Sequence, residues 1–355
     1  MAKRLRSAGW GRLFQHSLKL MTGPAARAGR ASVVRAVRAG AQAGAQALKP
    51  PPGPGDWLPG VVMGAAGVRS YRVYRPPGVG MATGMGTGTG IGANIGNRVP
   101  LVVMLHGCGQ DAKTFAVSTR MNRIAAREGF IVLYPEQDRV ANLQGCWNWF
   151  DTDTGRAYGE AGLIMKAIDQ VALLYPVDRG RVAVVGLSAG ASMAALLAVR
   201  DPERFRAVVM HSGIPPGSAH SPLSALGAMH GRRAGAAGAA RSGPASSASV
   251  EWPPLLVIHG ANDSVVSPRN GQAAAMAWAN AAGAVASPAR GVQRGQRYPM
   301  TVTDFHHGKR MVAQWVGVSH LGHAWSGGAA GKAHSDAKGP DASRMAWAFI
   351  KRQWP

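Results

Sequence analysis

The sequence predicts an α/β fold with a mostly parallel central sheet and helices on both faces. Three observations lead to this prediction. Short apolar runs alternate with longer stretches of helical character, as in successive β-α-β units. A serine flanked by glycines, in Gly186-Leu187-Ser188-Ala189-Gly190, stands where an apolar run meets a small-residue helix. An aspartate and a histidine follow two later apolar runs, so the three polar residues fall at the edge where such sheets bind ligands.

The elements follow from runs of aliphatic and β-branched residues that end in turn-forming residues. Strands are predicted at residues 69–75, 99–105, 130–134, 181–186, 206–211, 254–259 and 311–318. Helices are predicted at residues 121–128, 162–174, 188–199, 271–282 and 342–353. The motifs below are spread over most of the 355 residues and belong to one site. We therefore expect a single catalytic domain over residues 61–355, behind an arm of residues 1–60.

The glycine-flanked serine is a candidate nucleophile. A serine on a tight strand-to-helix turn exposes its hydroxyl at the carboxyl edge of a sheet, and the nearby glycines let the backbone bend. A helix cap is the alternative role for Ser188. Asp263 follows the strand at 254–259 and His323 follows the strand at 311–318. The order serine, aspartate, histidine is that of the α/β-hydrolases.

Each polar residue has a separate predicted role. His323 would take the serine proton and return it to the leaving alcohol, and Asp263 would hold the imidazole in one tautomer. Asp263 in a turn-forming role, or Asp304 as the acid, is the less favoured alternative. His320 competes with His323, which we prefer because Gly322 loosens its loop. The two histidines lack a third ligand cluster, so no metal is expected.

A tetrahedral intermediate needs two donors for its oxyanion. One is expected to be the backbone N–H of Ala189, directly after the nucleophile. The second would come from the loop after the strand at 99–105, which reads His106-Gly107-Cys108-Gly109-Gln110. Its H-G-x-G arrangement favours the Cys108 N–H, the alternative being a plain glycine-rich turn.

These motifs together resemble the polyhydroxybutyrate depolymerase family of esterases. The resemblance rests on the 106–110 loop, Tyr134-Pro-Glu136, Cys146-Trp-Asn-Trp-Phe150, the serine turn, His211-Ser-Gly213 and Gly322-His-Ala-Trp325, in that order. It implies an α/β-hydrolase fold, hydrolysis of carboxylic esters and no metal or organic cofactor. It also implies Ser188, Asp263 and His323 as catalytic residues and Cys108 as an oxyanion donor. Related esterases act on feruloyl or acetyl groups of polysaccharides, so the resemblance leaves the substrate open.

The expected substrate is a short-chain or oligomeric hydroxyalkanoate ester. Depolymerases of insoluble polymer carry a further binding domain, whereas little sequence follows the last predicted helix. This favours soluble or amorphous esters. Trp147, Trp149 and Trp325 are candidates for an apolar surface that binds the acyl group, with core packing as the alternative.

Two low-complexity segments are predicted to interrupt the domain, near residues 78–97 and 227–249. The first contains a formal dinucleotide-binding pattern at 88–93. No strand leads into it and no helix follows, so nucleotide binding is rejected. The second is expected to be an inserted loop near the acid-bearing strand.

The first fifty residues carry many Lys and Arg and no acidic residue, and the chain has a formal net charge of +23. We expect a solvated arm, the alternative being a basic amphipathic segment that docks on an anionic surface. The positive charge also suggests an alternative function, a polyanion-binding protein built on an inactive hydrolase. No aromatic-basic binding pattern supports a specific nucleic acid, and no stretch is long enough to span a membrane.

The two cysteines, Cys108 and Cys146, lie in separate motifs. A disulfide between them would brace the 106–110 loop and require an oxidising compartment, but the sequence cannot establish the pairing. A secretory signal is not visible, which favours the cytoplasm. We expect export because the resemblance points to it.

Overall fold

The computed structural model describes residues 51–81, 98–232 and 251–354. Within them an 11-stranded sheet has the order β1-β2-β4-β3-β5-β6-β7-β11-β10-β8, and β9 pairs with β10. The strands are β1 Asp56–Gly64, β2 Gly67–Arg75, β3 Val99–Leu105, β4 Ile131–Pro135, β5 Val177–Leu187, β6 Ala207–His211, β7 Leu255–Gly260, β8 Val285–Ala286, β9 Arg290–Val292, β10 Met300–His307 and β11 Arg310–Val318. The short strands β12 Trp325–Ser326 and β13 Ser335–Asp336 pair separately.

The middle of the sheet, β4-β3-β5-β6-β7-β11, is parallel. The flanking strands are antiparallel: β2 and β1 at one side, and β10 with β8 and β9 at the other. The parallel arrangement brings the carboxyl ends of β3, β5, β6, β7 and β11 to one edge. The loops that follow these strands carry the residues of the candidate site.

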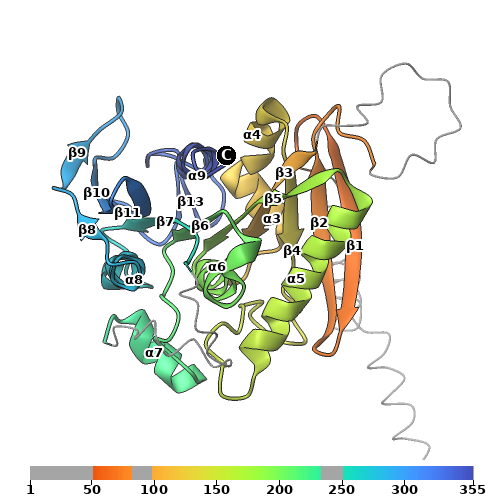
Figure 1. Ribbon diagram of the computed structural model, residues 1–355, viewed down its shortest axis with the longest axis horizontal. Coiled ribbons are helices and arrows are strands. Elements are labelled where there is room, and N and C mark those ends of the chain that lie inside the picture. The colour runs from red at the N-terminus through yellow and green to blue at the C-terminus, as the bar shows by residue number, and fades with distance from the viewer. Residues whose placement is uncertain (1–50, 82–97, 233–250, 355) are drawn as a thin grey trace, which may run out of the picture. The chain divides into compact units, whose positions relative to one another are not determined.

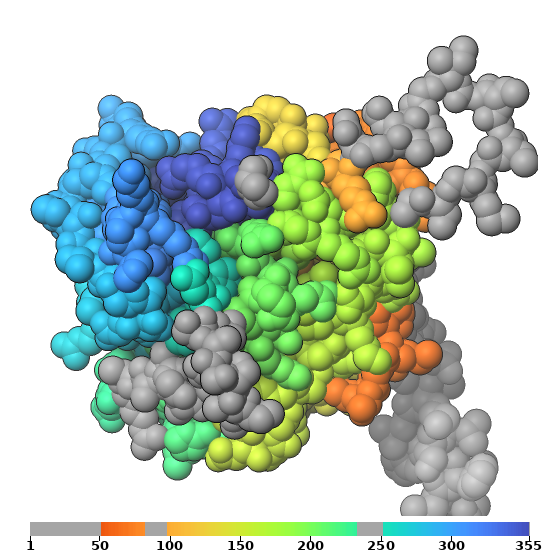
Figure 2. Space-filling view, viewed as in Figure 1, coloured from red at the N-terminus to blue at the C-terminus, as the bar shows by residue number. Residues whose placement is uncertain are grey.

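The helices cover the two faces of the sheet. They are α3 Ala112–Thr119, α4 Met121–Glu128, α5 Arg156–Leu174, α6 Ala189–Arg200, the 3-10 helix η1 Pro202–Arg204, α7 Pro222–Met229, α8 Pro268–Ala281 and α9 Ala342–Lys351. Alternate residues of β3 belong to two hydrophobic clusters. Leu101 and Val103 are in the cluster that also contains residues of α5, α6 and α8, whereas Val102 and Met104 are in the cluster that contains residues of α3, α4 and α9. Figure 1 shows α5, α6 and α8 across one face of the sheet. Figure 2 shows the same side, with the blue C-terminal part beside the green residues around α6.

The predicted α/β fold with a mostly parallel sheet is confirmed, and every predicted strand and helix has a counterpart. Two longer strands were missed. In β1, Pro59 and Gly60 interrupt the apolar run, yet Gly60 pairs with Tyr71, whose ring occupies the space that a Cβ at Gly60 would take. Proline is tolerated because β1 is an edge strand. The predicted domain boundary between residues 60 and 61 therefore falls inside a strand. The second missed strand, β10, has polar residues in alternation with buried ones.

Several predicted features lie outside the described residues. These are residues 1–50 of the arm, residues 82–97 of the first low-complexity segment and residues 233–249 of the second. The beginning of the second segment is helical, since α7 runs to Met229. In the described parts of the chain, no helix is both long and apolar enough to cross a membrane.

Candidate active site

Ser188 occupies the sharp turn between β5 and α6. Its backbone angles are φ 55° and ψ −122°, a conformation that residues with a side chain rarely adopt. The Ser188 N–H donates to the carbonyl of His211 at 2.8 Å, which fixes the turn to the end of β6. A Cβ on Gly186 would lie 2.2 Å from the carbonyl oxygen of Gly190, and a Cβ on Gly190 would lie 2.2 Å from that of Leu105. Both glycines are therefore needed for the turn to close against β3.

Three side chains from separate strand ends form a continuous chain of hydrogen bonds. His323 Nε2 lies 2.9 Å from Ser188 Oγ, and His323 Nδ1 lies 2.7 Å from Asp263 Oδ2. The Asp263 side chain is fully buried, whereas that of His323 is 13% exposed. In this arrangement the serine hydroxyl can donate to Nε2 while the Nδ1–H donates to the carboxylate.

The Asp263 carboxylate is held by several donors. Its Oδ1 accepts the backbone N–H groups of Val265 at 3.0 Å and Val266 at 2.8 Å, and its Oδ2 lies 3.3 Å from His259 Nε2. Burial raises the pKa of Asp263, but the hydrogen bonds from His259, His323 and the Val266 N–H outweigh it and hold the pKa well below its usual range. The carboxylate is therefore ionised and able to stabilise a positive charge on His323.

The loops that carry the acid and the base are tied to each other. A Cβ on Gly260 would lie 2.2 Å from the carbonyl oxygen of Leu321, so only glycine allows this approach. The Asn262 N–H donates to the same carbonyl at 3.0 Å. The contact fixes the distance between Asp263 and His323.

The alternative acid and base have partners elsewhere. His320 is exposed, and its ring centroid lies 5.7 Å from that of Tyr298. Asp304, on β10, accepts hydrogen bonds from Arg290 at 2.5 Å and from Gln314 at 2.6 Å. The geometry thus brings His323 and Asp263, and not these two residues, to Ser188.

The 106–110 loop lies directly against the serine turn, because Gly190 packs on the carbonyl groups of Leu105 and His106. The backbone N–H of Gly107 donates to Gln110 Oε1, that of Gly109 to the Gln144 carbonyl and that of Gln110 to the Gly107 carbonyl. Among the residues that the structure describes, the N–H of Cys108 has no such acceptor. The Cys108 N–H is therefore available to bind a ligand oxygen.

Cys108 and Cys146 form a disulfide, with a Cα–Cα distance of 4.3 Å. The bond links the 106–110 loop to the segment before α5. This is one of the two pairing states that the sequence left open.

Two buried histidines support the site and were not assigned roles from the sequence. His211 Nε2 accepts the Ser326 N–H at 3.1 Å, and its ring stacks on Trp325. Burial, with His259 and His323 nearby, lowers the pKa of His211 to about 3, so the ring is neutral. His259 Nε2 lies 2.9 Å from the Val266 carbonyl and next to Asp263. Both histidines stand at the end of a buried strand, a position that is also typical of core residues, and His211 also belongs to the His211-Ser-Gly213 motif.

The prediction of an acyl-binding surface is wrong for two of its three tryptophans. Trp147 and Trp325 are completely buried, and their indole N–H groups donate to the His106 carbonyl and to Ser343 Oγ. They support the site from within the core. Trp149 is 7% exposed and lines a cavity of about 270 Å³ beside α6. The other lining residues are Thr152, Asp153, Tyr158, Ser192, Leu196, Pro216, Gly217, Ala219 and His220.

In the described ranges, no three His, Cys, Asp or Glu side chains are grouped so as to hold a metal ion.

Comparison with protein families gives a match to the family described as esterase PHB depolymerase, over residues 69–296. The poly(3-hydroxyalkanoate) depolymerase C of Paucimonas lemoignei is 34% identical over 175 residues, which are 48% of this chain and 42% of that protein. The chain thus matches less than half the length of this relative. Feruloyl esterase B of Neurospora crassa is 28% identical over 246 residues, covering 62% of this chain and 78% of that protein.

Solved structures share the fold. An acetyl xylan esterase from Aspergillus awamori superimposes with a TM-score of 0.56 at 20% identity, covering 82% of this chain and 99% of that one. A ferulic acid esterase superimposes with a TM-score of 0.53 at 16% identity, covering 85% of this chain and 99% of that one.

Proposed function

The chain belongs to the esterase PHB depolymerase family, since the match to this family covers more than half of the chain. From this premise we propose that the protein hydrolyses carboxylic esters with Ser188 as nucleophile. The observation that carries the proposal is the chain of contacts from Ser188 Oγ through His323 to Asp263, at 2.9 Å and 2.7 Å. A hydroxyl becomes a competent nucleophile when a base within hydrogen-bond distance takes its proton. The fixed aspartate keeps that base in the required tautomer.

Acylation begins when Ser188 Oγ attacks the ester carbonyl and His323 Nε2 takes the hydroxyl proton. The resulting oxyanion is bound by the backbone N–H groups of Cys108, in the 106–110 loop, and Ala189, at the start of α6, which Gly190 brings into contact. The intermediate collapses, the C–O bond to the alcohol breaks, and His323 gives its proton to the leaving oxygen. Water then attacks the acyl-enzyme with His323 again as base, which releases the acid and restores Ser188.

For the substrate we favour short-chain or oligomeric hydroxyalkanoate esters. The cavity beside α6 supports a small group, since its volume of about 270 Å³ is below the ~300–1,000 Å³ of sites for drug-sized ligands. It adjoins the nucleophile turn, because the Ser192 hydroxyl in its wall also donates to the Ser188 carbonyl at 3.4 Å. Trp149 is the one tryptophan of the three that remains a candidate for substrate contact.

A feruloyl or acetyl ester is the second candidate substrate. It is favoured by the similarity to feruloyl esterase B and to acetylxylan esterase A of Emericella nidulans, which is 27% identical over 195 residues. A polyanion-binding protein on an inactive hydrolase is disfavoured, because the proposed nucleophile, base, acid and both oxyanion donors are all present. The proposed docking of the basic arm on an anionic surface concerns residues outside the described ranges.

We propose that the protein is exported. The Cys108–Cys146 disulfide supports this, since such bonds persist in oxidising compartments.

The experiment that tests the function is hydrolysis of p-nitrophenyl butyrate by the purified protein and by Ser188→Ala. We expect turnover by the parent and a loss of at least about 10³-fold in kcat for the variant, as for other serine hydrolases that lose a member of the triad. Equal rates for the two proteins would refute the proposed nucleophile. Rates on hydroxybutyrate oligomers, feruloyl esters and acetyl esters then separate the candidate substrates.

A further inference from the structure

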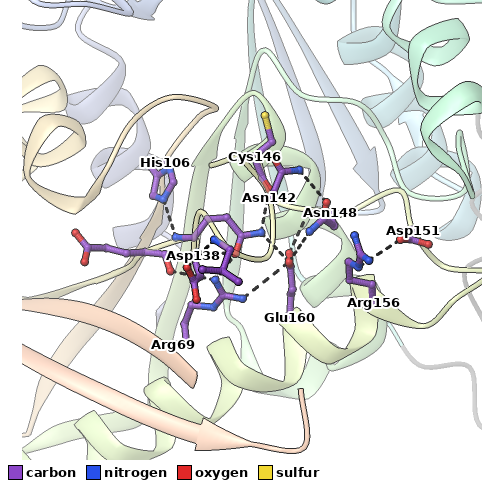
Figure 3. Close-up of polar contacts among 12 residues, drawn as sticks. Arg69, His106, Asp138, Asn142, Cys146, Asn148, Asp151, Arg156 and Glu160 are labelled. Carbon is purple, nitrogen blue, oxygen red and sulfur yellow. Dashed lines mark hydrogen bonds and ion pairs between the residues drawn. The ribbon is translucent and has the colours of Figure 1, made fainter. Parts of the chain in front are cut away.

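A buried polar cluster lies behind the 106–110 loop. It consists of Arg69 on β2, Gln137 after β4, and Asn148 and Glu160 before and within α5, and we call these four residues the brace. None of them is more than 7% exposed. Arg69 and Glu160 point toward each other, with 3.9 Å between Arg69 Nη2 and Glu160 Oε1 (Figure 3). A buried ion pair is costly unless its remaining donors and acceptors are satisfied.

Glu160 is the residue to which the rest of the brace is bonded. Its Oε1 accepts the side-chain amides of Gln137 and Asn148, both at 2.7 Å, and its Oε2 accepts the backbone N–H of Asn148 at 2.9 Å. Arg69 donates to the Gln137 side-chain oxygen. A charged acceptor in a dry environment makes strong hydrogen bonds, so the positions of Gln137 and Asn148 are set by one carboxylate.

The brace is bonded to the 106–110 loop from two sides. The Gln137 N–H donates to His106 Nε2 at 3.0 Å, and His106 is two residues before Cys108 in the chain. The Gln137 side-chain amide also donates to the Cys146 carbonyl at 2.9 Å, and Cys146 is bonded to Cys108 through sulfur. Asn148 accepts at its Oδ1 from Asn142, which lies in the same segment as Cys146 (Figure 3).

We propose that Glu160 is a positioning residue that keeps the Cys108 N–H aimed at the oxyanion. It touches no reacting atom and acts through Gln137, His106 and the disulfide. This inference rests on the proposed function, because it assigns to the brace the placement of one proposed oxyanion donor. Displacing a donor in an oxyanion site lowers the rate of the chemical step and leaves ground-state binding nearly unchanged.

The test is Glu160→Gln, which keeps the shape of the side chain but removes the charge and places a donor against donors. On p-nitrophenyl butyrate we expect kcat to fall about 10- to 100-fold with KM within about threefold, the loss typical of a misplaced catalytic group. Binding of an alkyl boronic acid, which forms a tetrahedral anionic adduct on the serine, should weaken by a similar factor. Titration with a fluorophosphonate gives the concentration of molecules with a reactive serine. Because kcat is calculated from that concentration, a loss of folded protein alone does not lower it.

The matched control is Asp169→Asn on the same helix. Asp169 also forms ion pairs, with Arg179 at 3.0 Å and with Arg204 at 2.5 Å, and neither partner belongs to the brace. We expect it to keep the parent kcat. Should Glu160→Gln not fold, Gln137→Met replaces it, because it removes the side-chain bonds and retains the backbone bond to His106.

A folded Glu160→Gln or Gln137→Met with parental kcat and boronate affinity would overturn the inference, as would an equal loss in Asp169→Asn. If Ser188→Ala is as active as the parent, the proposed function itself fails. If Ser188→Ala is inactive while the brace variants are unaffected, only the positioning role fails.

Discussion

The tautomer of His323 depends on the carboxylate of Asp263. In Asp263→Asn the side chain has almost the same size, but the group opposite His323 Nδ1 can be an amide donor. The ring would then carry its proton on Nε2 and could not accept the Ser188 proton. We expect kcat for p-nitrophenyl butyrate to fall about 10³- to 10⁴-fold with little change in KM.

The control for this substitution is His320→Ala, since His320 is exposed and contacts Tyr298. It should retain the parental kcat and KM. A loss of less than tenfold in Asp263→Asn, or a large loss in His320→Ala, would mean that the acid or the base has been misassigned.

Sequence patterns identified some residues of the candidate site and not others, and the reason is physical. Ser188, Asp263 and His323 follow predicted strands in a recognisable order, so their common edge could be inferred. His259 also ends a strand, but only the fold shows that its ring lies against Asp263. Trp147 and Trp325 were assigned to a surface because a sequence does not reveal which side of a loop a tryptophan faces. Each donates its N–H to a partner in the core.

At Gly190, α6 lies directly against the end of β3. In Gly190→Ala the new methyl group would lie 2.2 Å from the Leu105 carbonyl oxygen and 2.5 Å from that of His106. Because these are backbone atoms, α6 or the 106–110 loop has to move. We expect a loss of about 1–3 kcal/mol in the free energy of unfolding and a loss of more than tenfold in kcat.

A matched glycine in α5 provides the control. A Cβ at Gly162 would meet nothing within 4 Å. Gly162→Ala should therefore stabilise the protein by about 0.5–1 kcal/mol, through the lower entropy of the unfolded chain, and leave kcat unchanged. Urea unfolding and steady-state rates measure both effects. Similar behaviour of the two variants would show that the contact at Gly190 does not constrain the site.

The elements that sequence patterns located are those buried on both faces. Strands such as β3 and β7 read as continuous apolar runs because helices cover both sides. The edge strand β1 and strand β10, which pairs with β11 on one side and with β8 and β9 on the other, were missed. Their stability comes from pairing with neighbours, as in the contact of Gly60 with Tyr71. The helices α3 and α7 are short, and each begins with a capping box around Asp111 or Ser221 that was not used as a signal.

At the scale of the folded domain, two histidines at the carboxyl edge of the sheet connect stability to pH. Burial, opposed by the bond to the Gly107 carbonyl, lowers the pKa of His106 to about 4, and burial lowers that of His211 to about 3. Both rings accept a backbone N–H at Nε2, from Gln137 and from Ser326, and this requires the neutral form. Protonation of either ring would place a donor against a donor.

The sign of the effect follows from proton binding. The unfolded chain protonates these histidines near pH 6.5, but the folded protein does so only near pH 4 and pH 3. Their contribution to stability is complete above about pH 7 and decreases as the pH falls. Between about pH 6 and pH 4 each histidine should remove about 1.4 kcal/mol per pH unit from the free energy of unfolding. The lowered pKa of Asp263 acts at lower pH, whereas the raised pKa values of Glu136 and Asp201 act in the opposite direction.

The measurement is therefore a difference between proteins. Urea unfolding is measured at about pH 7.5, 6 and 5. The free energy of unfolding of the parent should decrease as the pH is lowered. The decrease should be smaller in His106→Gln, whose amide oxygen can still accept the Gln137 N–H. The carboxylates are common to both proteins and cancel in the comparison. Parallel curves would show that His106 is protonated in the folded state or solvated there, and would contradict its burial as a neutral acceptor behind the loop that carries Cys108.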